Sequence, residues 1–402
     1  MSEPRATVAI IGAGTMGAGI AQVALEAGWK VVLHDPQADA TAGARVRIYD
    51  GLLRRASRLE ANADAMEDWA AGRIARLVIA ASAADAAADA HLVIEAVIED
   101  LATKQRLFAE LDRSAPPATV LATNTSALSV SRIAEGARVA PDRVVGMHFF
   151  NPAPRLDLVE VVAGALSADW AVERAMAIAD DWGKTAIRSK DSPGFIVNRV
   201  NRPFTLEPLR LLRAGAGTIV AIDEAVTAAG FPMGPFALMD LIGIDVNLAA
   251  ARGLFEGFGR AARFRPSPIQ EELVAAGSLG RKAGHGFYRY EQGRTLGPAP
   301  RFERPERGLP GAATLAPEAI AERVFLAVVN EAYRALADGV ATADDIDRAM
   351  RLGASHPFGP FEWVRRTGLE EVAMSLDALS DEDADTFRPA LALLREARRT
   401  RG

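Results

Sequence analysis

The chain has 402 residues, of which 50% are hydrophobic and 24% charged, and its formal net charge is −6. This length suits two or three domains that each bury a core, while the acidic balance offers no general basic field to attract nucleic acid or a membrane surface. The chain contains no cysteine, which excludes disulfides, thiolate nucleophiles and cysteine-ligated zinc. With no signal-peptide pattern and no apolar segment of membrane length, we expect a cytoplasmic protein.

The N-terminal region shows the order strand, glycine-rich turn, helix, strand. Residues 7–11, "TVAII", are an apolar and β-branched run typical of a buried strand, and "GAGTMG" follows directly. A helical pattern covers residues 15–27 and ends at a glycine, and "KVVLHD" at 30–35 is the next strand. In this context a G-x-G-x-x-G motif indicates dinucleotide binding; a glycine turn in another kind of β–α–β unit is the alternative.

The residues of this motif have distinct expected roles. Gly12 permits the tight turn, Gly14 lets the backbone approach a pyrophosphate, and Gly17 allows close packing of the helix. The helix N-terminus presents unpaired N–H groups to the phosphates. Asp35 ends the second strand, where a carboxylate accepts a hydrogen bond from the ribose 2′-hydroxyl and repels a 2′-phosphate. The sequence therefore favours NAD over NADP.

Strand patterns continue to alternate with helical ones along the first half of the chain. Residues 37–76 are helical in pattern, charged and rich in alanine. Strand-like runs follow at residues 76–80, 91–97, 119–124 and 143–149. This alternation predicts an α/β fold with a Rossmann-like, doubly wound parallel sheet, in which the nucleotide lies at the carboxyl ends of the strands.

The pattern changes after "SKDSPGF". From about residue 190 to 290 we find helical patterns and no convincing strand. Residues 291–316 are rich in glycine, proline and arginine and lack apolar periodicity, which is typical of a linker. The sequence therefore predicts an NAD-binding Rossmann-like domain at residues 1–188 and a first helical module at 189–290. A linker at 291–316 and a second helical module at 317–402 follow.

An internal repeat links the two helical modules. Glu207 and Asp223 are separated by the same number of residues as Glu331 and Asp347, and a Gly-Pro-Phe sequence follows each pair. The period of 124 to 125 residues indicates a duplicated all-α module. Two unrelated helical bundles are the alternative, but they would not place Gly-Pro-Phe at the same offset twice.

Two residues of the first half form a candidate catalytic pair. "RVVGMHFFNP" is expected to be a strand that ends at His148, and "LDLVEVV" is expected to be the next strand, with Glu160 among apolar neighbours. If the strands are adjacent, the carboxylate bonds the imidazole, fixes its tautomer and raises the basicity of the far ring nitrogen. Such a pair suits a general base. The alternative is a core histidine satisfied by a buried acid.

Several stretches in this order resemble the 3-hydroxyacyl-CoA dehydrogenase family: "GAGTMGAGIA", "EAVIED", "NTSAL", "HFFNPAPRLDLVEVV", "DSPGFIVNR", "FPMGPF" and "GRKAGHGFYRY". The resemblance covers about residues 6–290, and the family's C-terminal helical module recurs at 317–370. It implies that His148 is the catalytic base and Glu160 its partner. It also implies that Ser126 and Asn198 hydrogen-bond the reacting oxygen or the thioester carbonyl of the substrate.

The resemblance also implies the binding residues. Glu99, Lys104, Asn124 and Met16, which lies in the glycine motif, are expected to contact NAD. Arg54, Arg55 and Arg58 fall near one face of the helical segment that contacts CoA in the family and are expected to meet the CoA phosphates, although a solvated basic face is an equal alternative. Arg155 and Asp157 replace an apolar residue and a lysine of the family pattern. No histidine has a second histidine three or four residues away, so no metal site is expected.

We therefore expect an NAD-dependent enzyme that reversibly oxidises a (3S)-3-hydroxyacyl-CoA to a 3-ketoacyl-CoA, as in β-oxidation of fatty acids or the degradation of aromatic acids. A non-catalytic protein that binds NAD and acyl-CoA on the same fold is one alternative, and a dehydrogenase of a free 3-hydroxyacid is another. The expected partner is the acyl-CoA substrate, without nucleic acid or membrane. The chain should be a monomer or homodimer in which the second helical module packs on the first.

Overall fold

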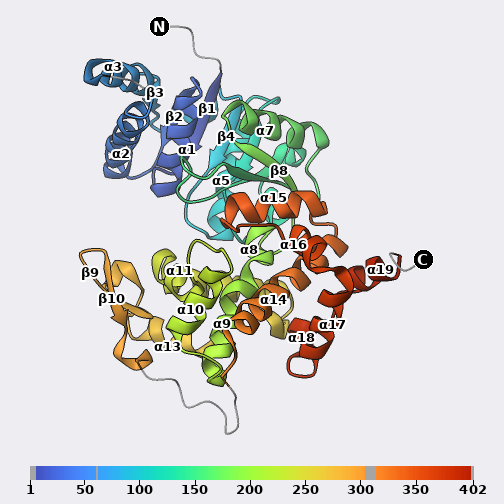
Figure 1. Cartoon of the computed structure of the whole chain (residues 1–402). Helices are drawn as coiled ribbons and strands as arrows, with labels where there is room; N and C mark the ends of the chain where they lie inside the picture. Colours follow the sequence, from blue (N-terminus) through green and yellow to red (C-terminus); the bar gives the residue numbers. More distant parts are fainter. Residues whose placement is uncertain (1–5, 60–61, 304–313, 400–402) are drawn as a thin grey trace. The chain divides into compact units, whose positions relative to one another are not determined.

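The structure is a computed structural model that describes residues 6–59, 62–303 and 314–399 (Figure 1). The chain divides between Phe195 and Ile196 into two compact units. The first unit is an α/β domain and the second is almost entirely helical, as Figure 1 shows. Among the described residues, no helix is both long and apolar enough to cross a membrane.

The described part of the first unit contains an eight-stranded sheet with the order β3-β2-β1-β4-β5-β6-β7-β8. Its central strands are short apolar runs with both faces buried, as expected for a sheet that lies between two helical layers. All seven strands expected from the sequence are present, and the Rossmann-like fold is confirmed. The strands are β1 (Thr7–Ile11), β2 (Lys30–His34), β3 (Leu77–Ile79), β4 (Leu92–Glu95), β5 (Val120–Thr123), β6 (Val144–Phe149), β7 (Leu158–Ala163) and β8 (Thr185–Lys190).

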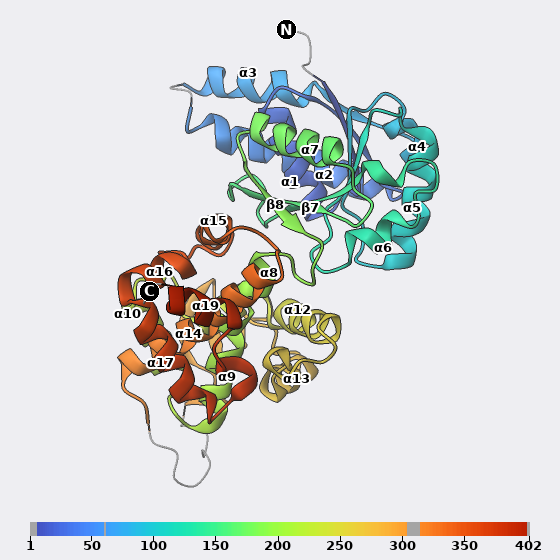
Figure 2. The ribbon, with the colours of Figure 1, turned by 90° about the vertical axis from the view of Figure 1, so that its right-hand side faces the viewer.

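Helices cover both faces of this sheet (Figure 2). Helices α1 (Thr15–Glu26), α2 (Ala38–Ala56), α3 (Ala63–Ile74) and α7 (Asp169–Asp181) share one apolar cluster with the strands. Helices α4 (Ala83–Ala87), α5 (Leu101–Ser114) and α6 (Val130–Ala134) share the other, and the 3-10 turn η1 (Pro141–Arg143) precedes β6. Side-chain caps begin α3, α4, α5 and α6 at Asn62, Ser82, Asp100 and Ser129.

One edge of the sheet differs from the expected parallel arrangement. Strand β7 runs antiparallel to β6, and β8, which was not expected from the sequence, runs parallel to β7. The segment that joins β6 to β7 contains no helix and is too short for a parallel crossover, which needs a dozen residues or more. The antiparallel turn brings the end of β6 and the start of β7 together.

The second unit consists mainly of helices. Its first part contains α8 (Val197–Val200), α9 (Arg202–Ala214), α10 (Ile219–Ala228), α11 (Pro235–Ile242), α12 (Ile244–Gly257) and α13 (Pro268–Ala275), with the short 3-10 turns η2 (Ala262–Phe264) and η3 (Arg281–Ala283). Its last part contains α14 (Pro317–Ala337), α15 (Ala343–Gly353), α16 (Pro360–Thr367), α17 (Leu369–Ser380), α18 (Ala384–Phe387) and α19 (Leu391–Arg399).

A β-hairpin lies between these two sets of helices, where no strand was expected. Strands β9 (Tyr288–Glu291) and β10 (Arg294–Pro298) pair antiparallel, and η4 (Pro300–Phe302) follows. The turn between the strands places Gln292 and Gly293 at positive φ, the conformation that a tight hairpin turn requires. The remainder of the expected linker includes residues 304–313, which lie outside the described residues.

The internal repeat is visible as equivalent contacts in the two sets of helices. The Asp223 carboxylate accepts hydrogen bonds from Phe236 N at 2.9 Å and Ala237 N at 3.0 Å, at the start of α11. The Asp347 carboxylate accepts them from Phe361 N at 2.8 Å and Glu362 N at 2.9 Å, at the start of α16. Each aspartate therefore caps the helix that begins at a Gly-Pro-Phe sequence, so the repeat is structural as well as sequential.

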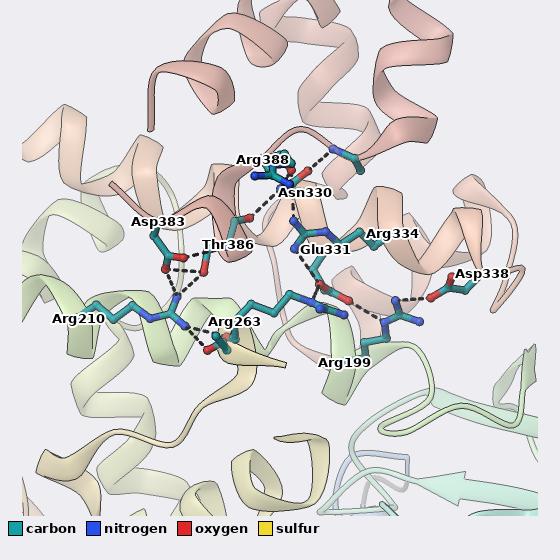
Figure 3. A network of polar contacts seen from close by, with 12 residues as sticks. Arg199, Arg210, Arg263, Asn330, Glu331, Arg334, Asp338, Asp383, Thr386 and Arg388 are labelled. Atoms are coloured by element: carbon teal, nitrogen blue, oxygen red, sulfur yellow. Dashed lines mark hydrogen bonds and ion pairs between the residues drawn. The ribbon is translucent and has the colours of Figure 1, made fainter. Parts of the chain in front are cut away.

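Reciprocal ion pairs join the two copies. Glu331 of α14 accepts from Arg199 Nε of α8 at 2.8 Å, while Glu207 of α9 accepts from Arg323 Nε of α14 at 2.7 Å. Arg323 stands 124 residues after Arg199, the same offset that separates Glu331 from Glu207. Figure 3 shows the Glu331 half of this arrangement, in which Arg263 and Arg334 also bond the carboxylate. The second module therefore packs on the first, as the sequence predicted.

Candidate active site

The expected catalytic pair is formed across the antiparallel strands β6 and β7. His148 and Glu160 are register partners, and His148 Nδ1 lies 2.6 Å from Glu160 Oε2. The imidazole is 4% exposed and the carboxylate is fully buried. A buried carboxylate beside Nδ1 favours the tautomer that carries its proton on Nδ1, which leaves the Nε2 lone pair as the basic site. The rings of Phe150 and Phe195 pack 4.5 and 5.8 Å from the imidazole.

The loop after β5 holds three of the expected site residues. Asn124 Oδ1 accepts from Phe149 N at 2.8 Å, so the side chain ties the end of β5 to the end of β6 beside His148. Ser126 is exposed, and its backbone N–H donates to Glu99 Oε1 at 3.0 Å. Thr125 Oγ1 donates to the same carboxylate oxygen at 2.5 Å. Glu99 therefore fixes the backbone of the loop that carries Ser126.

A buried ion pair that the sequence did not reveal supports this loop. Lys104 Nζ, which is 1% exposed, lies 2.6 Å from the fully buried carboxylate of Glu95 and 3.2 Å from that of Glu99. Thr123 Oγ1 donates to the other oxygen of Glu95 at 2.6 Å. Burial alone would raise the pKa of Glu99, but the charge of Lys104 and the hydrogen bonds from Thr125 and Ser126 outweigh it and lower that pKa.

The glycine loop has the geometry that a bound pyrophosphate requires. Gly12 has φ +108°, and a Cβ there would lie 2.5 Å from Ala96 O. A Cβ on Gly17 would collide with Gly12 O, whereas a Cβ on Gly14 would project into open space at the N-terminus of α1. That open space, faced by unpaired N–H groups, suits a diphosphate. Met16 is partly buried and packs on the core beneath.

Asp35 follows β2 directly and is bonded to the glycine loop. Its Oδ2 accepts from Ala13 N at 2.8 Å and its Oδ1 accepts from Gln37 N at 2.9 Å. Arg47 of α2 donates through Nη2 to Ala13 O at 2.8 Å. The carboxylate therefore has a fixed position beside the loop and retains lone pairs on both oxygens. The residues suit a dinucleotide whose ribose hydroxyls face Asp35.

A cavity of about 410 Å³ lies between α1, α2 and the segment that joins β6 to β7. Five arginines line it together with one glutamate, Glu26; the arginines are Arg47, Arg54, Arg55, Arg58 and Arg155. Arg54, Arg55 and Arg58 were expected from the sequence to meet the phosphates of CoA, whereas Arg47 and Arg155 were not. Lys184 Nζ holds the joining segment by donating to Ala153 O at 2.8 Å and Leu156 O at 2.9 Å. Within the described residues Arg155 forms no ion pair with Asp157.

Asn198 lies in the second unit, in the short helix α8. The next residue, Arg199, is buried and donates to Glu331 and to Asp338, so α8 is fastened to α14. The structure thus brings His148, Glu160, Asn124, Ser126, Glu99 and Lys104 together in the first unit, while Asn198 belongs to the other. No cluster of three potential metal ligands is present among the described residues.

Known proteins resemble this chain over most of its length. Residues 7–192 match the model of the 3-hydroxyacyl-CoA dehydrogenase NAD-binding domain, and residues 194–290 and 320–400 match that of the C-terminal domain of the same enzymes. The chain is 36% identical to a 3-hydroxyadipyl-CoA dehydrogenase of Escherichia coli, over 97% of each chain. It is 38% identical to a 3-hydroxybutyryl-CoA dehydrogenase of Mycobacterium tuberculosis, over 72% of this chain and all of that one. The crystal structure of an E. coli 3-hydroxybutyryl-CoA dehydrogenase superposes with a TM-score of 0.85 at 35% identity, over 98% of each chain.

Proposed function

Since the chain belongs to the 3-hydroxyacyl-CoA dehydrogenase family, we propose that it oxidises a 3-hydroxyacyl-CoA to the 3-ketoacyl-CoA with His148 as the general base. The observation that carries this proposal is the buried pair of His148 Nδ1 and Glu160 Oε2, 2.6 Å apart. A protein that only binds NAD and acyl-CoA has no need of a base oriented in this way. The enzyme is NAD-dependent, as its family is.

The chemistry follows from the protonation states of the pair. His148 Nε2 accepts the proton of the C3 hydroxyl, and the imidazolium that forms is stabilised by the carboxylate of Glu160. NAD, when bound, accepts the hydride from C3. Ser126 and Asn198 are proposed to hydrogen-bond the reacting oxygen or the thioester carbonyl; as neutral donors they orient the substrate without competing for the proton. In the reverse direction His148 returns the proton.

The arginine-lined cavity is proposed to bind the phosphates of CoA. CoA carries a diphosphate and a further phosphate, and five guanidinium groups around one cavity of about 410 Å³ provide matching charge. Arg54 and Arg58 belong to this set, together with Arg47, Arg55 and Arg155. An overall acidic chain needs such a local group of cations to hold a polyanionic substrate.

The proposed function is tested by NADH consumption with acetoacetyl-CoA. His148→Ala should lower kcat by about two to four orders of magnitude, the usual loss when a general base is removed, while NADH binding measured by fluorescence persists. Glu160→Gln should also lower kcat, because an amide orients the ring but does not stabilise its cation. A wild-type chain without activity, or a His148→Ala variant with near-normal kcat, would contradict the proposal.

A further inference from the structure

One buried arginine of the second unit has no carboxylate partner among the residues that the structure describes. The described residues include three buried arginines, Arg143, Arg199 and Arg202. Arg143 is paired with Asp112, and Arg199 with Glu331. Arg202 is 6% exposed, yet no acidic side chain of the described residues lies within 4 Å of it. Burying a guanidinium without an anion beside it lowers the stability of the folded chain. The presence of Arg202 at this position therefore needs an explanation.

The hydrogen bonds of Arg202 are also incomplete. Its Nε is enclosed and has no acceptor among the described residues. Its Nη1 has only two long contacts, with Thr205 Oγ1 at 3.5 Å and Asn247 O at 3.4 Å. Burial lowers the pKa of Arg202 to about 10, which leaves the group charged at neutral pH. The site therefore holds a cation with unused donors.

The surroundings of Arg202 do not compensate this charge. Asn201 has helical dihedral angles and its N–H donates to Val197 O, so α9 continues α8 and Arg202 stands inside a helical segment. Asn247, whose backbone oxygen contacts Arg202, accepts a side-chain hydrogen bond from Gln270 Nε2 at 2.8 Å, and Gln270 is fully buried with an Oε1 that has no donor among the described residues. A bound anion would satisfy the guanidinium.

Arg202 lies one helical turn beyond Asn198. Residues 197–200 are helical, Asn201 has helical dihedral angles, and α9 continues from Arg202. Residues four apart in such a segment lie on the same side, about 6 Å apart along the axis. Asn198 is one of the two residues proposed above to bind the reacting oxygen or the thioester carbonyl of the substrate. The anion at Arg202 would therefore belong to the same substrate, a few carbon atoms beyond C3.

We propose that Arg202 binds the terminal carboxylate of a dicarboxylic acyl chain and so selects a 3-hydroxydicarboxylyl-CoA of about six carbons. This inference rests on the proposed function and specifies its substrate. Three carbon–carbon bonds of about 1.5 Å each separate C3 from the carboxyl carbon of a six-carbon chain, which spans roughly 4 Å. A four-carbon acyl group ends one atom beyond C3 and has no charge to offer. A carboxylate accepts charge-assisted hydrogen bonds from a guanidinium, and the terminal nitrogen Nη1 of Arg202 makes only long contacts with the described residues.

Arg155 is the other candidate for binding a terminal carboxylate, since it replaces an apolar residue of the family pattern near the catalytic strands. It lines the cavity that holds four further arginines of the first unit, and it is exposed. That setting fits the phosphates of CoA, which every acyl-CoA carries. Arg155 is therefore a matched control for Arg202.

The experiment compares two substrates of equal length, 3-ketoadipyl-CoA and 3-ketohexanoyl-CoA, which differ only in the terminal carboxylate. The wild-type chain should prefer 3-ketoadipyl-CoA by at least tenfold in kcat/KM. In Arg202→Met this ratio should fall by roughly ten- to hundredfold, the loss expected when a charged hydrogen-bonded partner is removed. The loss should appear mainly in KM. Arg155→Met should weaken both thioesters equally and leave the ratio unchanged.

Two further measurements keep the inference testable if Arg202→Met does not fold. Arg202→Lys keeps the charge but loses the paired donors, so the ratio should fall less than in Arg202→Met. Adipate should inhibit acetoacetyl-CoA reduction by the wild-type chain more strongly than hexanoate does. A wild-type chain that reduces both six-carbon substrates equally would overturn the inference and leave the proposed function intact. Equal losses on both substrates in Arg202→Met, with a lowered melting temperature, would show that Arg202 is structural only and would also overturn it.

Discussion

Replacing Glu331 by glutamine tests how the second helical module supports the first. The Glu331 carboxylate is 1% exposed and accepts from Arg199 Nε and Arg263 Nε, each at 2.8 Å, and from Arg334 Nη1 at 3.4 Å. The amide keeps the shape of the side chain but removes the charge. In Glu331→Gln the NH₂ group of the new amide also faces a guanidinium instead of an acceptor.

The expected loss of stability is large because Arg199 remains buried. After the substitution, Asp338 is the one acidic side chain of the described residues still paired with Arg199, and it is 56% exposed and therefore screened by water. Breaking a buried ion pair by removing one charge costs about 3–5 kcal/mol of unfolding free energy. For a unit of this size each kcal/mol corresponds to about 2–4 °C, so the melting temperature of the second unit should fall by roughly 6–20 °C.

The assay is thermal unfolding followed by circular dichroism, with urea unfolding for the free energy. Glu256→Gln is the matched control, because Glu256 pairs with Arg260 on the exposed surface of the same unit and should cost less than about 0.5 kcal/mol. Glu331→Gln should also lower kcat, since Arg199 adjoins Asn198. A melting temperature shifted no more than in the control would refute the reasoning.

Three other predictions concern cofactor choice, pH dependence and the repeat. The wild-type chain should use NAD much better than NADP, because Asp35 beside the glycine loop repels a 2′-phosphate; equal kcat/KM for both cofactors would contradict this role. His356 is buried among Phe204, Phe231 and Phe325, and burial lowers its pKa from 6.5 to about 3. Below pH 6.5 His356 binds a proton in the unfolded chain but not in the folded chain. The free energy of unfolding, measured with urea, should therefore fall by about 1.4 kcal/mol for each pH unit below 6.5. This slope should be smaller in His356→Leu. Deletion of residues 317–402 removes α14, whose buried apolar face packs on the first copy, and so exposes the apolar surface of that copy. Light scattering should then detect aggregation or a new dimer. A stable monomer with unchanged activity would argue against this packing role.

The parts of the fold and site that sequence reasoning predicted depend on local patterns. The glycine motif between a strand and a helix predicts its own conformation, since Gly12 and Gly17 occupy positions where a Cβ collides with backbone. The pairing of His148 with Glu160 was also predictable, because two strands joined by a short segment are usually neighbours. The repeat of Glu207 and Asp223 at Glu331 and Asp347 correctly predicted two copies that pack together.

The features that were missed depend on contacts between distant residues. The pairing of Lys104 with Glu95 joins a helix to the end of a strand, and neither residue has a local pattern that marks it as buried. Arg202 has no acidic partner among the described residues, and no sequence motif reports such a lack. The β9–β10 hairpin contained a local signal, Gln292-Gly293 between alternating residues, but the charged, glycine-rich composition of the segment favoured a linker.

The joining of both helical copies in one polypeptide has a consequence for dilute solutions. In a dimer held by such reciprocal ion pairs, the subunits would separate below the dissociation constant and Arg199 would lose its partner. Within one chain the local concentration of α14 around α8 and α9 is set by covalent connection, which typically corresponds to millimolar, and does not change on dilution. Asn198, which adjoins Arg199, therefore keeps this support from α14 at any enzyme concentration.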